Sequence, residues 1–238
     1  MTHDPRAKAL EIHRRLLAVY CEPESPIDRD PVHALVLTIL SQNTNDRLRD
    51  IAFGRLRAAL PTWEQVRDAP VKQIGDAIQV AGLWKQKAAR IKQVLQRITE
   101  ERGSITLGFL RDMPMEEARQ YLLSFKGVGP KTAAIILLFT LDMPAFPVDT
   151  HIHRVTRRLG LIPDRTSREK AHDLLEALLP AETYYAFHIN LIRHGRDTCG
   201  ARRPRCEACP LRDLCDYHCR ALNHRAAETT ENSRETES

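Results

Sequence analysis

Four cysteines near the end of the chain have a spacing that suits a metal centre. The spacing is C-x6-C-x2-C-x5-C, and the residues are Cys199, Cys206, Cys209 and Cys215. Four thiolates so close together can bind one centre if the chain wraps around it. Their unequal gaps suit a compact iron–sulfur cubane better than the paired C-x2-C knuckles of a zinc ribbon. The ligand pattern alone leaves a zinc site and a disulfide knot as alternatives.

The loop between the first two of these cysteines, residues 200–205, is rich in arginine. If both flanking cysteines bind one centre, the loop becomes a small rigid protrusion that carries Arg202, Arg203 and Arg205. Clustered guanidinium groups are typical of surfaces that contact a phosphate backbone. We therefore expect these three arginines to bind nucleic acid.

The string FKGVGPKT, residues 125–132, suits a second kind of chemistry. Gly127 and Gly129 allow positive φ and leave the backbone bare, so that its N–H groups can approach a phosphate. Pro130 is typical of the first turn of a helix, whose N-terminal dipole also favours an anion. The alternative interpretation is an ordinary connection between two helices.

Lys131 and Asp149 are the candidate catalytic residues. Beside a phosphate-binding hairpin, the Lys131 amine could attack a sugar C1′ and form a Schiff base; elsewhere such a lysine is most often a solvated surface residue. Asp149 directly precedes an apolar helical stripe, which predicts a helix N-cap. A rigidly held capping carboxylate could also stabilise an oxocarbenium-like sugar or accept a proton from the lysine.

The elements that must position these residues are helices. Apolar residues recur at spacings of three and four through most of the chain, whereas strand-like alternation never persists beyond a few residues around 104–107. The pattern predicts an all-α fold of about ten helices joined by short loops. The apolar stripes are Ala9, Ile12, Leu16 and Tyr20; Leu35 and Ile39; Ile91, Val94, Leu95 and Ile98; Ala118, Tyr121, Leu122 and Phe125; Ile152, Val155 and Leu159; and Ala171, Leu174, Leu175 and Leu178.

Size and charge restrict the class of protein and of partner. A chain of 238 residues is long enough for one large domain or two joined ones. Its net charge of +5 and pI of about 9.0 favour an acidic polymer as partner. Residues 226–238 hold four Glu, one Arg and no apolar side chain larger than Ala. We therefore expect a disordered acidic tail over 224–238.

The sequence also suggests a compartment. Its opening lacks the apolar core of a signal peptide, so we expect a cytoplasmic protein, nucleoid-associated if the source is bacterial. In a reducing compartment, clustered thiols favour metal ligation over disulfides. The longest apolar stretch, residues 133–141, is interrupted by Thr140 and is too short to span a bilayer.

Taken in order along the chain, these motifs resemble the endonuclease III family of helix–hairpin–helix DNA glycosylases. The features that carry the resemblance are the hairpin over 127–133, the string Val148-Asp149-Thr150-His151 and the four-cysteine spacing. The resemblance covers about residues 5–217. It implies a six-helix barrel domain with the helix–hairpin–helix over 25–143. It also implies a [4Fe–4S] cluster domain made from 1–24 and 144–223, and a DNA groove between the two domains.

The resemblance also implies a function. The expected activity is removal of damaged bases, usually oxidised pyrimidines, from double-stranded DNA, followed by cleavage of the abasic strand. A monomer would do this with Lys131 as the nucleophile, Asp149 as the catalytic carboxylate, and Cys199, Cys206, Cys209 and Cys215 as cluster ligands. Two alternatives stay open: a monofunctional adenine or mismatch glycosylase, and a damage-binding Fe–S protein with little catalysis. The presence of Lys131 counts against the monofunctional enzyme, whose relatives generally lack this lysine.

Two further stretches resemble DNA-probing loops of the family. Residues 41–46 correspond to the loop that fills the gap left by an everted nucleotide, with Asn43 in place of the usual glutamine. Residues 82–88 resemble the wedge loop, with Leu83 as the intercalating side chain. The alternatives are a polar helix start for Thr44 and Asn45, and a core position for Leu83. In the hairpin, Lys126 replaces the usual proline. The expected DNA contacts are Asn43, Leu83, Lys126, Gly127, Val128, Gly129, Arg202, Arg203 and Arg205.

Overall fold

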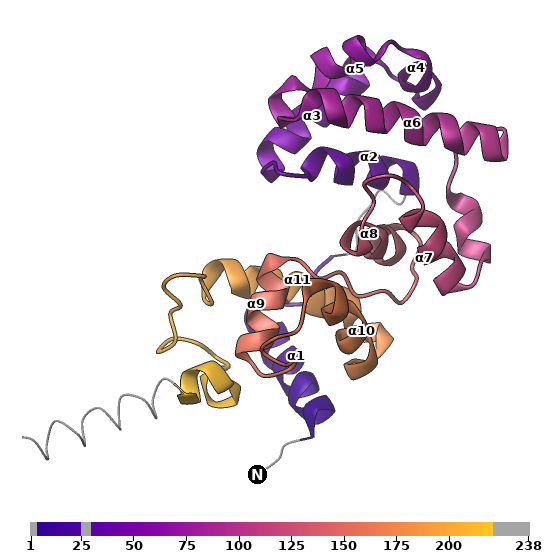
Figure 1. Cartoon of the computed structure of the whole chain (residues 1–238). Coiled ribbons are helices and arrows are strands. Elements are labelled where there is room, and N and C mark those ends of the chain that lie inside the picture. Colours follow the sequence, from indigo (N-terminus) through magenta and orange to yellow (C-terminus); the bar gives the residue numbers. More distant parts are fainter. Residues whose placement is uncertain (1–3, 25–29, 221–238) are drawn as a thin grey trace, which may run out of the picture. The chain divides into compact units, whose positions relative to one another are not determined.

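The computed structural model describes residues 4–24 and 30–220, and all the regular structure in these residues is helical (Figure 1). This confirms the all-α prediction. The expected acidic tail over 224–238 lies outside the described residues. No helix among those described is long and apolar enough to cross a membrane. In chain order the α-helices are α1 (Pro5–Tyr20), α2 (Pro31–Ser41), α3 (Asp46–Ala59), α4 (Trp63–Asp68), α5 (Val71–Ile78), α6 (Trp84–Arg102), α7 (Met115–Leu123), α8 (Pro130–Thr140), α9 (Thr150–Arg158), α10 (Arg168–Leu178) and α11 (Tyr184–Asp197).

Contacts between residues divide the chain into two compact units. One unit comprises the described residues between 26 and 143, and the other combines those of 1–25 with those of 144–238. Lys131 and the hairpin belong to the first unit. Asp149 and the four cysteines belong to the second. Each unit therefore has its own core and its own candidate site.

The unit of residues 26–143 is packed around α2. This helix begins where Asp30 accepts a hydrogen bond from the N–H of Val32, at 2.9 Å, with Pro31 in the first turn. One face of α2 is apolar and buried, and the helix packs against α3, α6 and α8. Its residues Leu35, Val36, Ile39 and Leu40 are completely buried. The helix that precedes the loop over 42–45 is therefore a rigid support.

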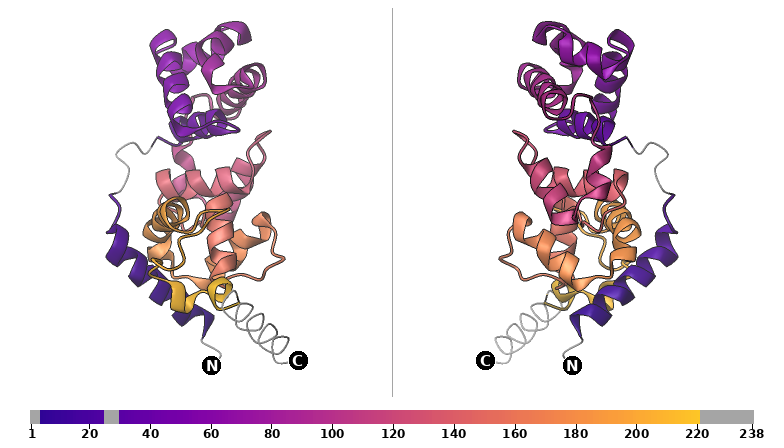
Figure 2. Two further views of the ribbon diagram at one scale, coloured as in Figure 1. Left: turned by 90° about the vertical axis from the view of Figure 1, so that its left-hand side faces the viewer. Right: turned by 90° about the vertical axis from the view of Figure 1, so that its right-hand side faces the viewer.

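The second unit joins both ends of the chain around α11. Helix α1 and helix α9 both pack against α11. In both views of Figure 2, α1 runs beside the orange and yellow segments that end the described chain. Two ion pairs fasten α1 to those segments: Lys8 Nζ lies 2.7 Å from Asp216, and Arg15 Nη1 lies 2.6 Å from Asp213. The N-terminal helix thus supports the cysteine segment.

The hairpin between α7 and α8 depends on one glycine for its shape. Gly127 has φ +84°, and a Cβ placed there would lie 2.3 Å from Cζ of Arg90. The Arg90 guanidinium donates to Oε1 of Gln42 at 2.6 Å, and the Gln42 amide donates to the carbonyl of Gly127 at 2.9 Å. Gly129 differs, because its φ is −100° and a Cβ there would meet nothing within 4 Å. Both glycines allow positive φ, but only Gly127 adopts it.

We predict that Gly127→Ala lowers the free energy of unfolding by about 2–3 kcal/mol, because alanine disfavours positive φ and displaces Arg90. Gly129→Ala is the matched control, with an expected cost of under about 1 kcal/mol because the position is extended and open. Urea unfolding of both variants measures the difference. Equal costs would show that the Arg90 and Gln42 contacts do not constrain the hairpin.

Candidate functional site

Lys131 lies where the sequence places it, in the first turn of α8. Its side chain is exposed and lines an open hollow of about 470 Å³ against α2 and the start of α3. The size is that of pockets that take small organic groups. An amine at the edge of such a hollow can reach a group that enters it. The hollow is lined by Asp30, His33, Ala34, Leu37, Thr38, Ser41, Thr44, Asp46, Arg49, Lys131, Ile135, Phe139 and Thr140.

The hairpin beside Lys131 has unused donors. Within the described chain, the N–H groups of Gly127 and Gly129 have no hydrogen-bond partner, and the side chain of Lys126 is exposed. Val128 has a different role, because its side chain is only 6% exposed and its N–H donates to the carbonyl of Phe125 at 3.0 Å. The hairpin can therefore offer an anion two backbone N–H groups and one ammonium. Val128 contributes core packing instead.

Two exposed residues of the same unit have left-handed backbones. Asn43 has φ +52° and Leu83 has φ +47°. Asparagine tolerates this conformation, but for leucine it costs about 1–2 kcal/mol. Leu83 is also 50% exposed, so its interpretation as a core residue under a glycine turn is wrong. A strained, exposed apolar side chain contributes little to folding, which is consistent with a function in binding.

The alternative interpretation of Thr44 and Asn45, a polar helix start, holds for Asn45 only. Asn45 caps α3, because its Oδ1 accepts from the N–H of Leu48 at 2.9 Å. Thr44 instead points inward: its hydroxyl donates to the carbonyl of Ala81 and accepts a hydrogen bond from Lys87. The loop over 42–45 is therefore both a helix start and a connection to the segment that precedes Leu83.

Lys87, which the sequence patterns did not single out, lies at the centre of this connection. It is 2% exposed, and burial lowers the pKa of its ammonium. The ammonium donates to the carbonyls of Leu40 and Ala81 at 2.8 and 2.7 Å, and to the Thr44 hydroxyl at 3.1 Å. It thus joins the end of α2 to the segments that carry Asn43 and Leu83. The sequence did contain a signal for its burial: Lys87 stands four residues before Ile91 and so lies on the apolar face of α6.

Asp149 belongs to the other unit, where it caps α9 as predicted. Its Oδ1 accepts from the N–H of Ile152 at 2.7 Å, and its side chain is half-buried. The chain that leads to it is fixed by two buried histidines. The Nδ1 atoms of His172 and His188 lie 2.9 Å from the carbonyls of Phe146 and Pro147. Because a carbonyl can only accept, both nitrogens carry a proton. These contacts hold the carboxylate in a defined place.

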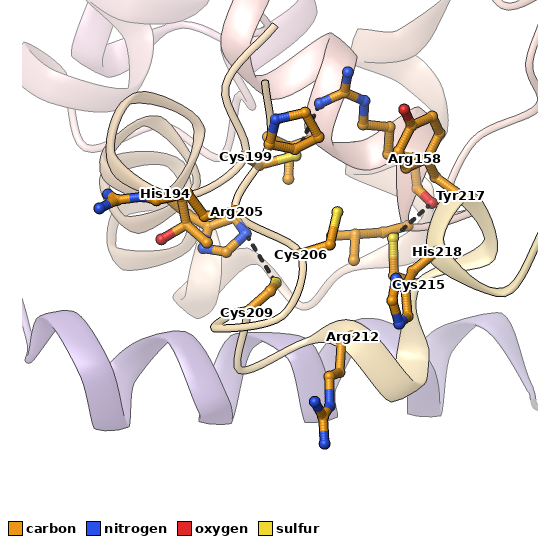
Figure 3. Close-up of a pocket in the computed structure, with 14 residues that line it drawn as sticks. Arg158, His194, Cys199, Arg205, Cys206, Cys209, Arg212, Cys215, Tyr217 and His218 are labelled. Carbon is orange, nitrogen blue, oxygen red and sulfur yellow. Dashed lines mark hydrogen bonds between the residues drawn. The ribbon is translucent and has the colours of Figure 1, made fainter. Parts of the chain in front are cut away.

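The four cysteines line one small pocket between α9, α11 and the final described segment (Figure 3). All four are free thiols, so the structure contains no disulfide knot there. Burial, together with the neighbouring thiols, raises the pKa of Cys209 to about 11, and burial also raises that of Cys215. Thiols gathered and buried in this way are stable as thiolates only beside a cation, which a metal centre supplies.

The spacing of these thiols favours a cluster over a single ion. Among the described residues, no group of three or more Cys, His, Asp or Glu side chains is arranged to hold a single metal ion. Zinc at about 2.3 Å from each sulfur needs tightly gathered ligands, whereas a cubane separates its ligands by its own width. The ligand set therefore fits a [4Fe–4S] cluster. Four iron–sulfur bonds would cross-link the segment over 199–215.

Basic side chains surround the cysteines. The Arg158 guanidinium donates to Sγ of Cys199 at 3.3 Å, and Cys215 donates to the carbonyl of Arg158 at 3.3 Å. Nε2 of His194 lies 3.7 Å from Sγ of Cys209, and burial lowers the pKa of His194 to about 4. Hydrogen bonds to ligand sulfurs are a recognised way in which a protein adjusts an iron–sulfur cluster.

The arginines of the loop over 200–205 are not equivalent. Arg202 and Arg203 are exposed, and no interaction of either side chain is found within the described chain. Arg205 donates to the carbonyl of Asp197 and lines the cysteine pocket, as Figure 3 shows. The loop is further held by Arg158, which donates to the carbonyls of Gly200 and Ala201 at 2.8 and 2.9 Å. Two arginines are thus free for a ligand on a fixed loop.

Comparison with known proteins identifies the family. Residues 36–181 match the model of the HhH-GPD superfamily of base excision DNA repair proteins. Residues 199–215, which contain all four cysteines, match the iron–sulfur binding domain of endonuclease III. The chain belongs to the endonuclease III family. It is a base excision DNA repair protein with a [4Fe–4S] cluster, and the four cysteines are the residues suited to bind that cluster.

Individual relatives support the assignment. An endonuclease III of Sulfolobus acidocaldarius is 34% identical over 80% of this chain and 83% of its own length. A candidate DNA glycosylase of Arabidopsis thaliana is 39% identical over 74% of this chain, which spans 58% of that protein. A solved structure of a trapped covalent intermediate of endonuclease III with DNA is 25% identical, with a TM-score of 0.77. It covers 91% of this chain and 98% of its own.

We predict that Lys87→Met lowers the free energy of unfolding by about 2–3 kcal/mol, because buried carbonyl acceptors lose their donor. It should also weaken binding to duplex DNA without changing the dependence of affinity on salt, because no phosphate contact is removed. Lys85→Met, on the exposed face of the same helix, is the control and should preserve stability. Both quantities are measured at a temperature where each variant is folded. An affinity loss that comes with a reduced salt dependence would indicate that Lys87 contacts DNA instead.

Proposed function

We propose that the protein is a DNA glycosylase with abasic-site lyase activity that removes oxidised pyrimidines from duplex DNA, with Lys131 as the nucleophile. The observation that carries the proposal is the place of Lys131: an exposed amine in the first turn of α8, beside a hairpin with free N–H groups and at the edge of a hollow. The family, and the covalent DNA complex of a similar endonuclease III, support it.

The proposed reaction proceeds through eversion of the lesion, attack with loss of the base, ring opening, β-elimination and hydrolysis. A lesion is everted from the duplex, and the neutral Lys131 amine attacks C1′ of its sugar as the bond from C1′ to the base breaks. The sugar ring opens to a Schiff base between Nζ and C1′. Loss of a proton from C2′ then expels the 3′ phosphate by β-elimination, and hydrolysis of the Schiff base releases the enzyme. Every step uses groups of the chain, the DNA and water.

Asp149 is proposed as the carboxylate of this reaction. A negative charge near the sugar stabilises the positive charge that develops at C1′ as the base departs. The same group could take the proton that Lys131 loses on attack. The cap hydrogen bond to Ile152 and the two histidine contacts behind it keep the carboxylate in one orientation, which such a role requires.

The proposed DNA contacts fall into two classes. The N–H groups of Gly127 and Gly129, with Lys126, Arg202 and Arg203, would bind phosphates and so contribute affinity that depends on salt. Leu83 would enter the base stack, and Asn43 would occupy the space that the everted nucleotide leaves. Asparagine reaches less far than the glutamine usual in the family. The left-handed backbone of Asn43 would compensate for this if it moves the side chain outward.

Two other functions remain as alternatives. A monofunctional glycosylase would use water in place of an amine, and the exposed Lys131 argues against it. A damage-binding Fe–S protein with little catalysis would keep the hairpin and the cysteines but would not need an amine beside a hollow. Trapping of a covalent complex on DNA separates both from the bifunctional enzyme.

We predict that borohydride traps the wild-type protein on a duplex with an abasic site and that Lys131→Gln abolishes the trapped complex. The variant should still bind the same duplex with nearly unchanged affinity, because Lys131 is proposed to attack the sugar and not to bind a phosphate. Lys126→Gln, which removes an exposed lysine of the hairpin, is the matched control: it should weaken binding and yet be trapped. If Lys131→Gln is trapped with wild-type yield, another residue is the nucleophile.

We also predict that Arg202→Ala combined with Arg203→Ala weakens binding to damaged and undamaged duplexes alike. The plot of log affinity against log salt should become shallower by about 2, or roughly one for each phosphate that the double variant no longer binds. The iron content should not change, because neither side chain contacts a cysteine. A double variant with the wild-type slope would show that the loop does not contact DNA.

A further inference from the structure

The unit that carries the cysteines contains a second basic region, apart from the loop over 200–205. Four arginines line an open hollow of about 490 Å³ beside α9, here named the α9 hollow. Its only lining carboxylate among the described residues is Asp164, so the guanidinium groups exceed the carboxylate by three positive charges. The lining residues are His153, Arg154, Arg157, Arg158, Asp164, Tyr217 and Arg220.

Two of the four guanidinium groups are held rigidly by backbone carbonyls. Arg154 donates to the carbonyls of Cys199 and Gly195, at 3.1 and 2.8 Å. Arg158 donates to two carbonyls of the loop over 200–205, and its guanidinium lies over the ring of Tyr217, 4.7 Å from the centroid. Arginines fixed in this way lose little conformational entropy when they bind an anion.

Arg157 gives the strongest indication of a ligand. Its Nε is buried and has no hydrogen-bond partner within the described chain. A buried charged donor without an acceptor is costly, and a bound ion or water is one arrangement that would satisfy it. Asp164 does not satisfy this atom: its carboxylate pairs with Arg220 at 2.7 Å, and Arg220 and, less strongly, Arg157 lower the pKa of Asp164, but it makes no hydrogen bond to Nε of Arg157.

We propose that the α9 hollow binds a phosphate group at the guanidinium groups of its arginines, among which that of Arg157 makes no hydrogen bond within the described chain. Planar guanidinium groups suit phosphate oxygens because each can donate two parallel hydrogen bonds. The phosphate could belong to a DNA backbone or to a free polyphosphate, since both present the same oxygens. In either case the bound anion would lie against arginines that hold Cys199 and the loop over 200–205, and so would stabilise the cysteine segment.

The test compares Arg157→Gln with Arg168→Gln in the full-length protein with its cluster. Arg168 is an exposed arginine of the same unit that does not line the hollow, so both variants lose one charge. Arg157→Gln should fold normally, because it removes a donor that has no partner. We expect calorimetry to show that tripolyphosphate binds Arg157→Gln about tenfold more weakly than Arg168→Gln, the effect of one charge-assisted hydrogen bond. Tripolyphosphate should likewise raise the melting temperature less in Arg157→Gln.

A second measurement identifies the source of the phosphate. If DNA occupies the hollow, Arg157→Gln should make the salt dependence of duplex binding shallower by about 1 and Arg168→Gln should not. An unchanged slope together with weaker tripolyphosphate binding assigns the hollow to a free anion. The DNA measurement alone rests on the proposed function, and borohydride trapping tests that function separately. The proposal is overturned if neither tripolyphosphate binding nor the salt slope distinguishes the two variants.

Discussion

The buried ammonium of Lys87 is the contact that joins the end of α2, the loop over 42–45 and the segment before Leu83. A charge in the interior is tolerated only if its donors are used. The three acceptors of Lys87 lie at the end of α2, in the loop over 42–45 and just before Leu83. The carbonyls of Leu40 and Ala81 are left at the ends of helical segments, where the backbone cannot satisfy them. One side chain therefore satisfies two helix ends and joins the segments that carry Asn43 and Leu83.

Polar side chains also connect distant segments at the hairpin. There the connection is made by Arg90 and Gln42. Arg90 from α6 and Gln42 from the first probing loop meet at Gly127, which must lack a side chain for them to do so. The hairpin, the loop over 42–45 and the segment before Leu83 are thereby connected through α6. This gives a physical reason for the strained backbone of Leu83: polar contacts on either side hold the loop in a conformation that leucine alone would avoid.

Sequence patterns predicted the helices, the cap at Asp149 and the cysteine cluster, because each depends on neighbours within a few residues. They could not predict the contacts of Lys87 or the pair of Gln42 and Arg90, since those join residues far apart in the chain. Gly127 and Gly129 illustrate the difference within one motif. The pattern contains two glycines, but only Gly127 has positive φ. It is also the one that faces Arg90, which comes from another helix. The role of Val128 was likewise hidden, because burial is a property of the assembled unit.

The arginines show why net charge alone is a poor guide to a binding surface. Arg154, Arg158 and Arg205 all lie near the cysteines, yet each donates to backbone carbonyls and so supports the cysteine segment. A guanidinium with its donors already used offers a phosphate mainly its charge, whereas Arg202, Arg203 and Arg157 still have donors to give. The two sets are also interdependent, because the fixed arginines hold the loop that presents the free ones. Anion binding at the loop over 200–205 or in the α9 hollow would therefore affect the same backbone carbonyls, those of residues 199–201.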